Sequence, residues 1–162
     1  MCFGVRDAIA HAHDLARQGP LTILGELVHN PVVREQLTSS GVIEASLDVP
    51  AAPSPRVMIT AHGASDRQRR KWKTAGYEVA DATCPLVRYA HEQLKRLVQR
   101  GYFPVVIGKA GHIEVRGLTE DFEQTFVVDH VTQLDQLPLH PRYGVITQTT
   151  HPIEHARRLV EA

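Results

Sequence analysis

The sequence contains little of what marks several common classes of protein. Its 162 residues include only two cysteines, and aromatic residues make up 6%. Two cysteines cannot form the disulfide framework of a small secreted protein. No apolar run approaches the roughly 20 residues that span a bilayer, and the first residues lack the basic segment and apolar core of a secretory signal. We therefore expect a soluble, cytoplasmic protein with no membrane partner.

The chain also has no excess of charge of either sign. Its 18 Lys and Arg residues balance 18 Asp and Glu residues. A protein that binds nucleic acid by neutralising phosphates is usually basic, so we expect no nucleic-acid partner. Ten histidines are the one unusual feature of the composition. Several of them converging in the fold would suggest an anion or metal site.

What is present is an alternation of helices and strands, which favours an α/β fold with parallel pairing. The apolar spacing and the Gly and Pro positions predict helices at residues 5–18, 31–40, 66–75, 85–100 and 151–161, and strands at residues 21–24, 56–61, 77–80, 103–107, 126–128 and 144–146. In the fourth helix, Leu86, Ala90, Leu94 and Leu97 are expected on one face. A boundary near residue 85 gives two small α/β lobes, residues 1–85 and 86–162.

Polar residues stand where the predicted strands end. His29, His62, Thr83-Cys84, Gly111-His112 and Thr147 to Thr150 all follow strands. In an open parallel sheet, the carboxyl ends of the strands face the ligand crevice. We therefore expect these side chains to gather where such a fold binds its ligand.

Cys84 lies in the run Asp-Ala-Thr-Cys-Pro-Leu-Val, directly before a predicted helix. The N-terminus of a helix favours a thiolate, which can act as a nucleophile or as a metal ligand. The alternative is a buried, inert thiol. Cys2 also precedes a predicted helix, but two cysteines this far apart show no zinc or iron–sulfur spacing.

Imidazole and carboxyl groups could supply hydrogen bonds and protons at these strand ends. His29, His62 and His112 could bind phosphate or relay protons, or they could be ordinary surface histidines. Glu114 could donate a proton if burial raises its pKa, or it could be a solvated residue in the first turn of a helix.

The hydroxyl run from Thr147 to Thr150 could position a ligand or pass a proton, or one threonine could cap the last helix. The remaining histidines fall on predicted helices or loops, and the sequence assigns no role to any of them: His11, His13, His91, His130, His140, His151 and His155.

Together, these segments resemble the LytB/IspH family, the 4-hydroxy-3-methylbut-2-enyl diphosphate (HMBPP) reductases of the methylerythritol phosphate pathway of isoprenoid biosynthesis. The matching runs, in the order of the family, are Cys-Phe-Gly-Val-Arg-Asp-Ala at 2–8, Gly-Glu-Leu-Val-His-Asn-Pro at 25–31, Ala-His-Gly-Ala-Ser at 61–65, Asp-Ala-Thr-Cys-Pro-Leu-Val at 81–87, Gly-Lys-Ala-Gly-His-Ile-Glu-Val-Arg-Gly at 108–117 and Thr-Gln-Thr-Thr at 147–150. Any one of these runs is weak evidence for the family, whereas the whole set in this order is specific for it.

The resemblance implies a three-lobed α/β enzyme around a 4Fe–4S cluster, with one cysteine from each lobe and a fourth iron open to substrate. By this resemblance Cys2 and Cys84 match cluster ligands, and His29 and His62 match residues that bind the substrate diphosphate. His112 matches a substrate-contacting and catalytic histidine, Glu114 the carboxyl group that supplies protons, and Thr149 a hydroxyl in contact with the substrate and in the proton path.

The reaction implied for the family is a reductive dehydroxylation of HMBPP to isopentenyl and dimethylallyl diphosphate. Iron acts as Lewis acid and electron conduit, while the protein binds the anion and supplies protons. The resemblance further implies a small diphosphate substrate and reduced ferredoxin or flavodoxin as electron donor.

The chain also departs from the family pattern. It stops at Ala162, before the third lobe with its third cysteine, so we expect a fragment, a truncated homologue, or one half of a split protein whose partner chain or extension supplies that lobe. A different class of function stays open, namely a non-catalytic module that keeps His29, His62 and His112 for a phosphorylated ligand and holds no cluster.

Overall fold

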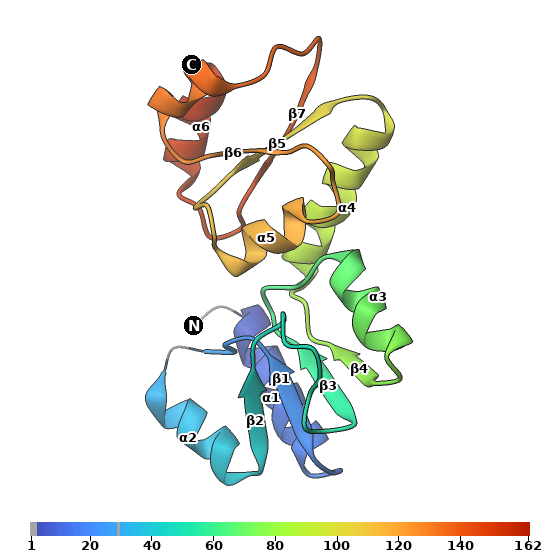
Figure 1. The fold of residues 1–162 in the computed structure, drawn as a ribbon. Helices are drawn as coiled ribbons and strands as arrows, with labels where there is room; N and C mark the ends of the chain where they lie inside the picture. The colour runs from blue at the N-terminus through green and yellow to red at the C-terminus, as the bar shows by residue number, and fades with distance from the viewer. Residues whose placement is uncertain (1–2, 29) are drawn as a thin grey trace. The chain divides into compact units, whose positions relative to one another are not determined.

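The computed structural model describes residues 3–28 and 30–162. The chain divides into two compact units, residues 1–85 and 86–162, and each unit has its own parallel sheet and its own core. In Figure 1 the first unit runs from blue to green and the second from yellow-green to red. The predicted α/β fold with two parallel sheets is confirmed.

The described residues of the first unit form three helices and a four-stranded sheet. Its elements are α1 (Phe3–Ala16), β1 (Leu21–Leu24), α2 (Pro31–Ser39), β2 (Val42–Ala45), β3 (Arg56–Ile59), α3 (Asp66–Thr74) and β4 (Glu78–Asp81). The strand order is β2-β1-β3-β4, and every neighbouring pair is parallel. The carboxyl ends of the strands therefore lie at one edge, from which the loops to His62 and Cys84 leave.

The limits of these helices follow from local sequence. The Asn30 side chain caps α2 by accepting a hydrogen bond from the Val32 backbone N–H at 3.0 Å, and Pro31 occupies the first turn, where no N–H is needed. Gly41 follows the helix with a φ of 81°, a conformation that glycine adopts without a Cβ penalty. The Ser65 hydroxyl caps α3 by accepting from the Gln68 N–H at 3.1 Å.

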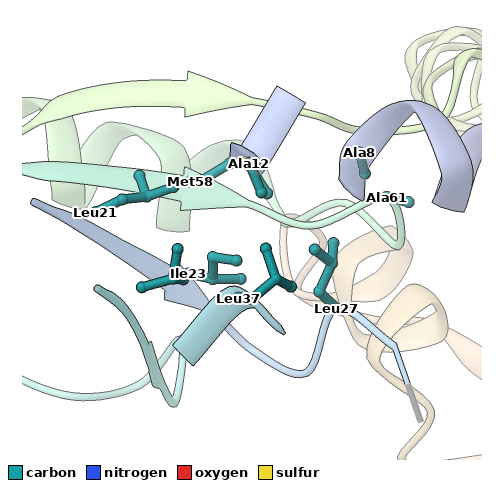
Figure 2. Close-up of a cluster of buried hydrophobic side chains, with 9 residues drawn as sticks. Ala8, Ala12, Leu21, Ile23, Leu27, Leu37, Met58 and Ala61 are labelled. Carbon is teal, nitrogen blue, oxygen red and sulfur yellow. The ribbon is translucent and has the colours of Figure 1, made fainter. Parts of the chain in front are cut away.

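Helices cover both faces of the first sheet. On one face, α1 and α2 pack against β1 and β3, and Figure 2 shows Ala8 and Ala12 of α1 and Leu37 of α2 among the strand side chains. On the other face, Trp72 of α3 packs with Val57 and other buried side chains of the sheet. Successive strand residues point to opposite faces, so the fully buried strand Leu21–Leu24 supplies both cores, with Leu21 and Ile23 on one face and Leu24 on the other.

The second unit has a three-stranded sheet with helices on both faces. Its elements are α4 (Pro85–Gln99, which begins at the boundary), β5 (Phe103–Ile107), α5 (Ile113–Thr119), β6 (Phe126–Val128), the 3-10 helix η1 (Val131–Gln136), β7 (Tyr143–Thr147) and α6 (Ile153–Glu161). The strands are parallel in the order β6-β5-β7. Side chains of α4 and α5 pack on one face, and those of α6 and η1 on the other.

Most of the predicted elements agree with the structure, but β2, α5 and η1 were not among the predicted elements. β2 was not predicted, because this edge strand buries only Val42 and so lacks the alternation typical of a half-buried strand. The expected apolar face of α4 is wrong in part. Leu86 is 53% exposed, while Val87 and His91 are buried beside Ala90 and Leu94. Among the described residues, none of the helices has the length and apolar character that crossing a bilayer requires.

Candidate functional site

In the second unit, the carboxyl group of Glu114 meets Thr149. Glu114 lies in the first turn of α5, and Thr149 lies in the loop after β7. The backbone N–H of Thr149 donates to Oε1 of Glu114 at 2.6 Å, and its hydroxyl donates to Oε2 at 3.0 Å. Because β5 and β7 are neighbours, the loops that follow them meet at the carboxyl edge of the sheet.

The surroundings of Glu114 favour its protonated form. Its side chain is fully buried, with 1% of its surface exposed. This burial raises the pKa of Glu114, and the hydrogen bonds from Thr149 and the charge of His112 offset only part of the increase. Glu114 therefore keeps its proton to a higher pH than a solvated glutamate, and the alternative of a solvated residue in the helix is wrong.

His112 is the N-cap of α5 and stands beside Glu114. Its Nδ1 accepts a hydrogen bond from the Glu114 backbone N–H at 3.2 Å. In a neutral imidazole this bond places the ring proton on Nε2, so Nε2 is the nitrogen that can donate to a ligand. His112, Glu114 and Thr149 are therefore brought together within one unit.

Gln148 holds the two loops of this site together, and sequence reasoning missed it. Its side-chain oxygen accepts from the Lys109 N–H at 3.1 Å, and its amide group donates to the Thr150 hydroxyl at 2.9 Å. A Cβ at Gly108 would lie 2.8 Å from the Cβ of Gln148, so this close approach needs glycine.

Helix α6 has Pro152 as its N-cap without a side-chain cap, so the alternative that a threonine caps this helix is wrong.

In the first unit, Cys84 follows β4 and directly precedes α4. It is a half-buried free cysteine whose backbone N–H donates to the Ala61 carbonyl at 3.0 Å. The residue that follows Ala61 in the sequence is His62, in the loop between β3 and α3. Cys84 borders a cavity of about 180 Å³ that is also lined by Gly4, Asp7 and His11. The thiol is therefore at a cavity rather than sealed in the core.

An ion-pair and hydrogen-bond network supports the loop that carries Cys84. Asp81 accepts hydrogen bonds from the backbone N–H and the hydroxyl of Thr83, and the Arg69 Nε–H donates to its Oδ2 at 3.0 Å. Burial alone would raise the pKa of Asp81, but Thr83 and the charge of Arg69 outweigh it and hold this pKa below its usual value. An aspartate whose side chain accepts a hydrogen bond from the backbone N–H two residues later forms an Asx turn. The sequence Asp81-Ala-Thr83 is compatible with such a turn, so the sequence could have indicated that Asp81 supports this loop.

Gly4 packs directly on Cys84, which yields a test of this arrangement. A Cβ at Gly4 would lie 2.7 Å from Sγ and 2.8 Å from Cβ of Cys84, closer than real contacts allow. Gly4→Ala should therefore displace the thiol and destabilise the chain by about 1–3 kcal/mol, as overpacking usually does. Urea unfolding and the rate of thiol modification, both in a Cys2→Ser background, would measure the two effects. Unchanged values would contradict the close approach.

The structure thus places the predicted site residues in two groups. His62 and Cys84 stand at the carboxyl edge of the first sheet, and His112, Glu114 and Thr149 at the carboxyl edge of the second. Two further predicted residues, Cys2 and His29, lie outside the described residues.

Two known proteins that are similar to this chain carry the same name. The chain is 34% identical over 161 residues to the 4-hydroxy-3-methylbut-2-enyl diphosphate reductase of Pelobacter propionicus, a match that covers 98% of this chain. It is 35% identical over 162 residues to the protein of the same name from Geobacter sulfurreducens, with 99% of this chain covered. The chain spans 57% of the length of each of these curated relatives.

Solved structures agree with this similarity. The E-1-hydroxy-2-methyl-but-2-enyl-4-diphosphate reductase from Plasmodium falciparum matches 99% of this chain and 52% of its own, with 28% identity and a TM-score of 0.90. An (E)-4-hydroxy-3-methyl-but-2-enyl diphosphate reductase matches 99% of this chain and 59% of its own, with 30% identity and a TM-score of 0.88. The family model described as LytB protein matches residues 1–162, and this chain therefore belongs to the LytB protein family.

Proposed function

We propose that this protein acts as an HMBPP reductase, converting HMBPP by reductive dehydroxylation to isopentenyl and dimethylallyl diphosphate. The observation that carries the proposal is the buried carboxyl group of Glu114, which is hydrogen-bonded through both oxygens to Thr149 and whose pKa is raised. A carboxyl group that keeps its proton to a higher pH than a solvated glutamate is better suited to donate a proton to a leaving hydroxyl. The names of the relatives support the same reaction.

The family implies a 4Fe–4S cluster, and the residues of the first unit fit such a group. Cys84 is a free thiol at the start of a helix, it borders a cavity, and Gly4 offers no side chain that would cover its sulfur. We propose that Cys84 and Cys2 hold the cluster, with a third thiolate from outside these 162 residues. When bound, the cluster would supply electrons and an iron that acts as a Lewis acid.

The residues of this chain would bind the substrate and move the proton. We propose that His29 and His62 donate hydrogen bonds to the substrate diphosphate, and that His112, with its proton on Nε2, contacts the substrate as a catalytic residue. The Glu114 carboxyl group would give its proton to the substrate hydroxyl, which then leaves as water. Thr149 would position Glu114 and contact the substrate through its hydroxyl. Reduced ferredoxin or flavodoxin is the proposed electron donor.

Anaerobic reconstitution with iron and sulfide tests this function. Iron analysis, visible and EPR spectra and HMBPP turnover should be measured on the 162-residue chain and on a form extended by a lobe that carries a third cysteine. We expect a cluster and turnover in the extended form. Binding of inorganic diphosphate in that form without a cluster would refute the reductase and favour a non-catalytic binding module.

A further inference from the structure

Three side chains with metal-binding atoms converge in the second unit, apart from the residues proposed to act on substrate. Asp129 follows β6, His151 lies between β7 and α6, and His155 lies in the first turn of α6. One carboxylate oxygen and one ring nitrogen of each histidine lie within 4.8 Å of one another. Figure 1 shows the end of β6 next to α6 in this unit. These histidines were assigned no role from the sequence.

One ring nitrogen of His151 is buried without a hydrogen bond to the part of the chain that the structure describes. Its side chain is only 9% exposed, and its Nε2 lies 3.9 Å from Oδ1 of Asp129. This nitrogen is buried and has no hydrogen-bond partner among the described residues. A buried polar atom without a partner is costly, and such an atom is frequently the sign of an ion or a water that completes the site.

The Nε2 atom of His155 is held by a hydrogen bond. Its Nε2 lies 2.7 Å from the backbone carbonyl oxygen of Asp129, and this bond requires a proton on Nε2. The lone pair of a neutral ring is then on Nδ1. A histidine that binds a metal commonly donates its other N–H to a carbonyl or carboxylate, which fixes the tautomer and the ring orientation. The ring of His151 packs edge-on against that of His155, with 5.0 Å between centroids.

We propose that Asp129, His151 and His155 form a binding site for a divalent transition-metal ion, with Zn²⁺ as its ion. Two imidazoles and one carboxylate, with water in the fourth position, are a ligand set that zinc commonly takes. Ligand atoms about 2.0 Å from a tetrahedral zinc lie roughly 3.3 Å apart. The ligand atoms lie within 4.8 Å of one another, with 3.9 Å between His151 Nε2 and Asp129 Oδ1, so side-chain rotations would have to bring them closer around the ion.

The site would have a structural effect on the neighbouring loop. Zinc would join the end of β6 to the start of α6, and the His151 backbone N–H donates to the Gln148 carbonyl at 2.9 Å. His151 is also only two residues after Thr149. The ion would therefore fix the end of the segment from residue 147 to residue 151. This site does not depend on the proposed reductase activity.

Zinc titration by calorimetry tests the site in the chain with Cys2→Ser and Cys84→Ser, which removes thiolate ligands. We expect one equivalent of Zn²⁺ to bind, and zinc at about 100 times Kd to raise Tm, because it binds the folded state. His151→Ala should weaken zinc binding at least ~10-fold. Even the loss of a residue that only supports a metal ligand typically lowers metal affinity about 10–100-fold. Bound Co²⁺ should give the visible absorption of a tetrahedral site.

Two further variants make the outcome decisive. Asp129→Asn keeps the side-chain shape and so tests the charge even if His151→Ala folds poorly; it too should weaken binding. His13→Ala, in α1 of the first unit, is the matched control and should bind zinc like the parent. Absence of zinc binding in the parent, or equal affinity in Asp129→Asn and the parent, would overturn the proposal.

Discussion

Glu114→Gln should abolish HMBPP turnover in the reconstituted protein while the fold and the cluster are retained. An amide has nearly the shape of the carboxyl group, and it can still accept from the Thr149 N–H and donate to the Thr149 hydroxyl. It has no acidic proton to give to a leaving hydroxyl. Loss of a general acid typically lowers the rate by about 10²–10⁴-fold. Steady-state kinetics with unchanged iron content would measure this effect.

The same substitution should stabilise the chain, which separates catalysis from folding. The pKa of Glu114 is raised in the folded state, so the stability of the wild type falls as pH rises from the unfolded pKa through the folded pKa. Glutamine does not titrate and avoids this loss. The Tm advantage of Glu114→Gln should therefore be small at acidic pH and grow to a few degrees above the folded pKa, since ~1 kcal/mol corresponds to ~2–4 °C at this chain length.

An exposed carboxyl group serves as the control for both effects. Glu123→Gln makes the same chemical change at a solvent-exposed position just beyond α5. It should alter neither turnover nor the pH dependence of Tm. Full turnover in Glu114→Gln would discard the proton-donor role, and an advantage in Tm that decreases with rising pH would contradict the raised pKa.

Cys84→Ser should remove the iron–sulfur cluster from the reconstituted protein, and turnover with it. A serine hydroxyl is a poor substitute for a thiolate as a ligand to iron, because clusters of this type are held by cysteine sulfur. Iron content, visible absorption and the EPR signal should all fall to background. Circular dichroism should stay unchanged, because Cys84 is only half-buried and its backbone bond to Ala61 does not involve the sulfur.

His11→Ala is the matched control for the cluster assignment. His11 lines the same cavity as Cys84, is exposed and carries no thiol. The His11→Ala protein should therefore take up iron and sulfide like the parent. A full cluster signal in Cys84→Ser would refute the assignment of Cys84 as a ligand.

Much of the fold was predictable, because it depends on short-range patterns. The strands at Leu21–Leu24 and Phe103–Ile107 are short, mainly apolar runs with glycine or proline close to both ends, and the structure places them as predicted. β2 could not be predicted this way, since an edge strand is defined by its pairing with β1 rather than by its own pattern. The buried face of α4 includes His91, which pairs with Asp121 at 3.0 Å, a contact that no apolar pattern reveals.

By itself, the sequence determined the α/β class, most of the helices and strands, and the residues that stand at the strand ends, because each of these depends on neighbours along the chain. It also carried the ordered motifs that mark the LytB family. Only the tertiary structure decided that Thr149 holds both oxygens of Glu114, that Gly4 packs on Cys84, and that Asp129, His151 and His155 converge. These contacts join residues from separate loops and helices, and sheet pairing brings them together. Burial and protonation depend on such contacts, so the sequence alone does not specify them.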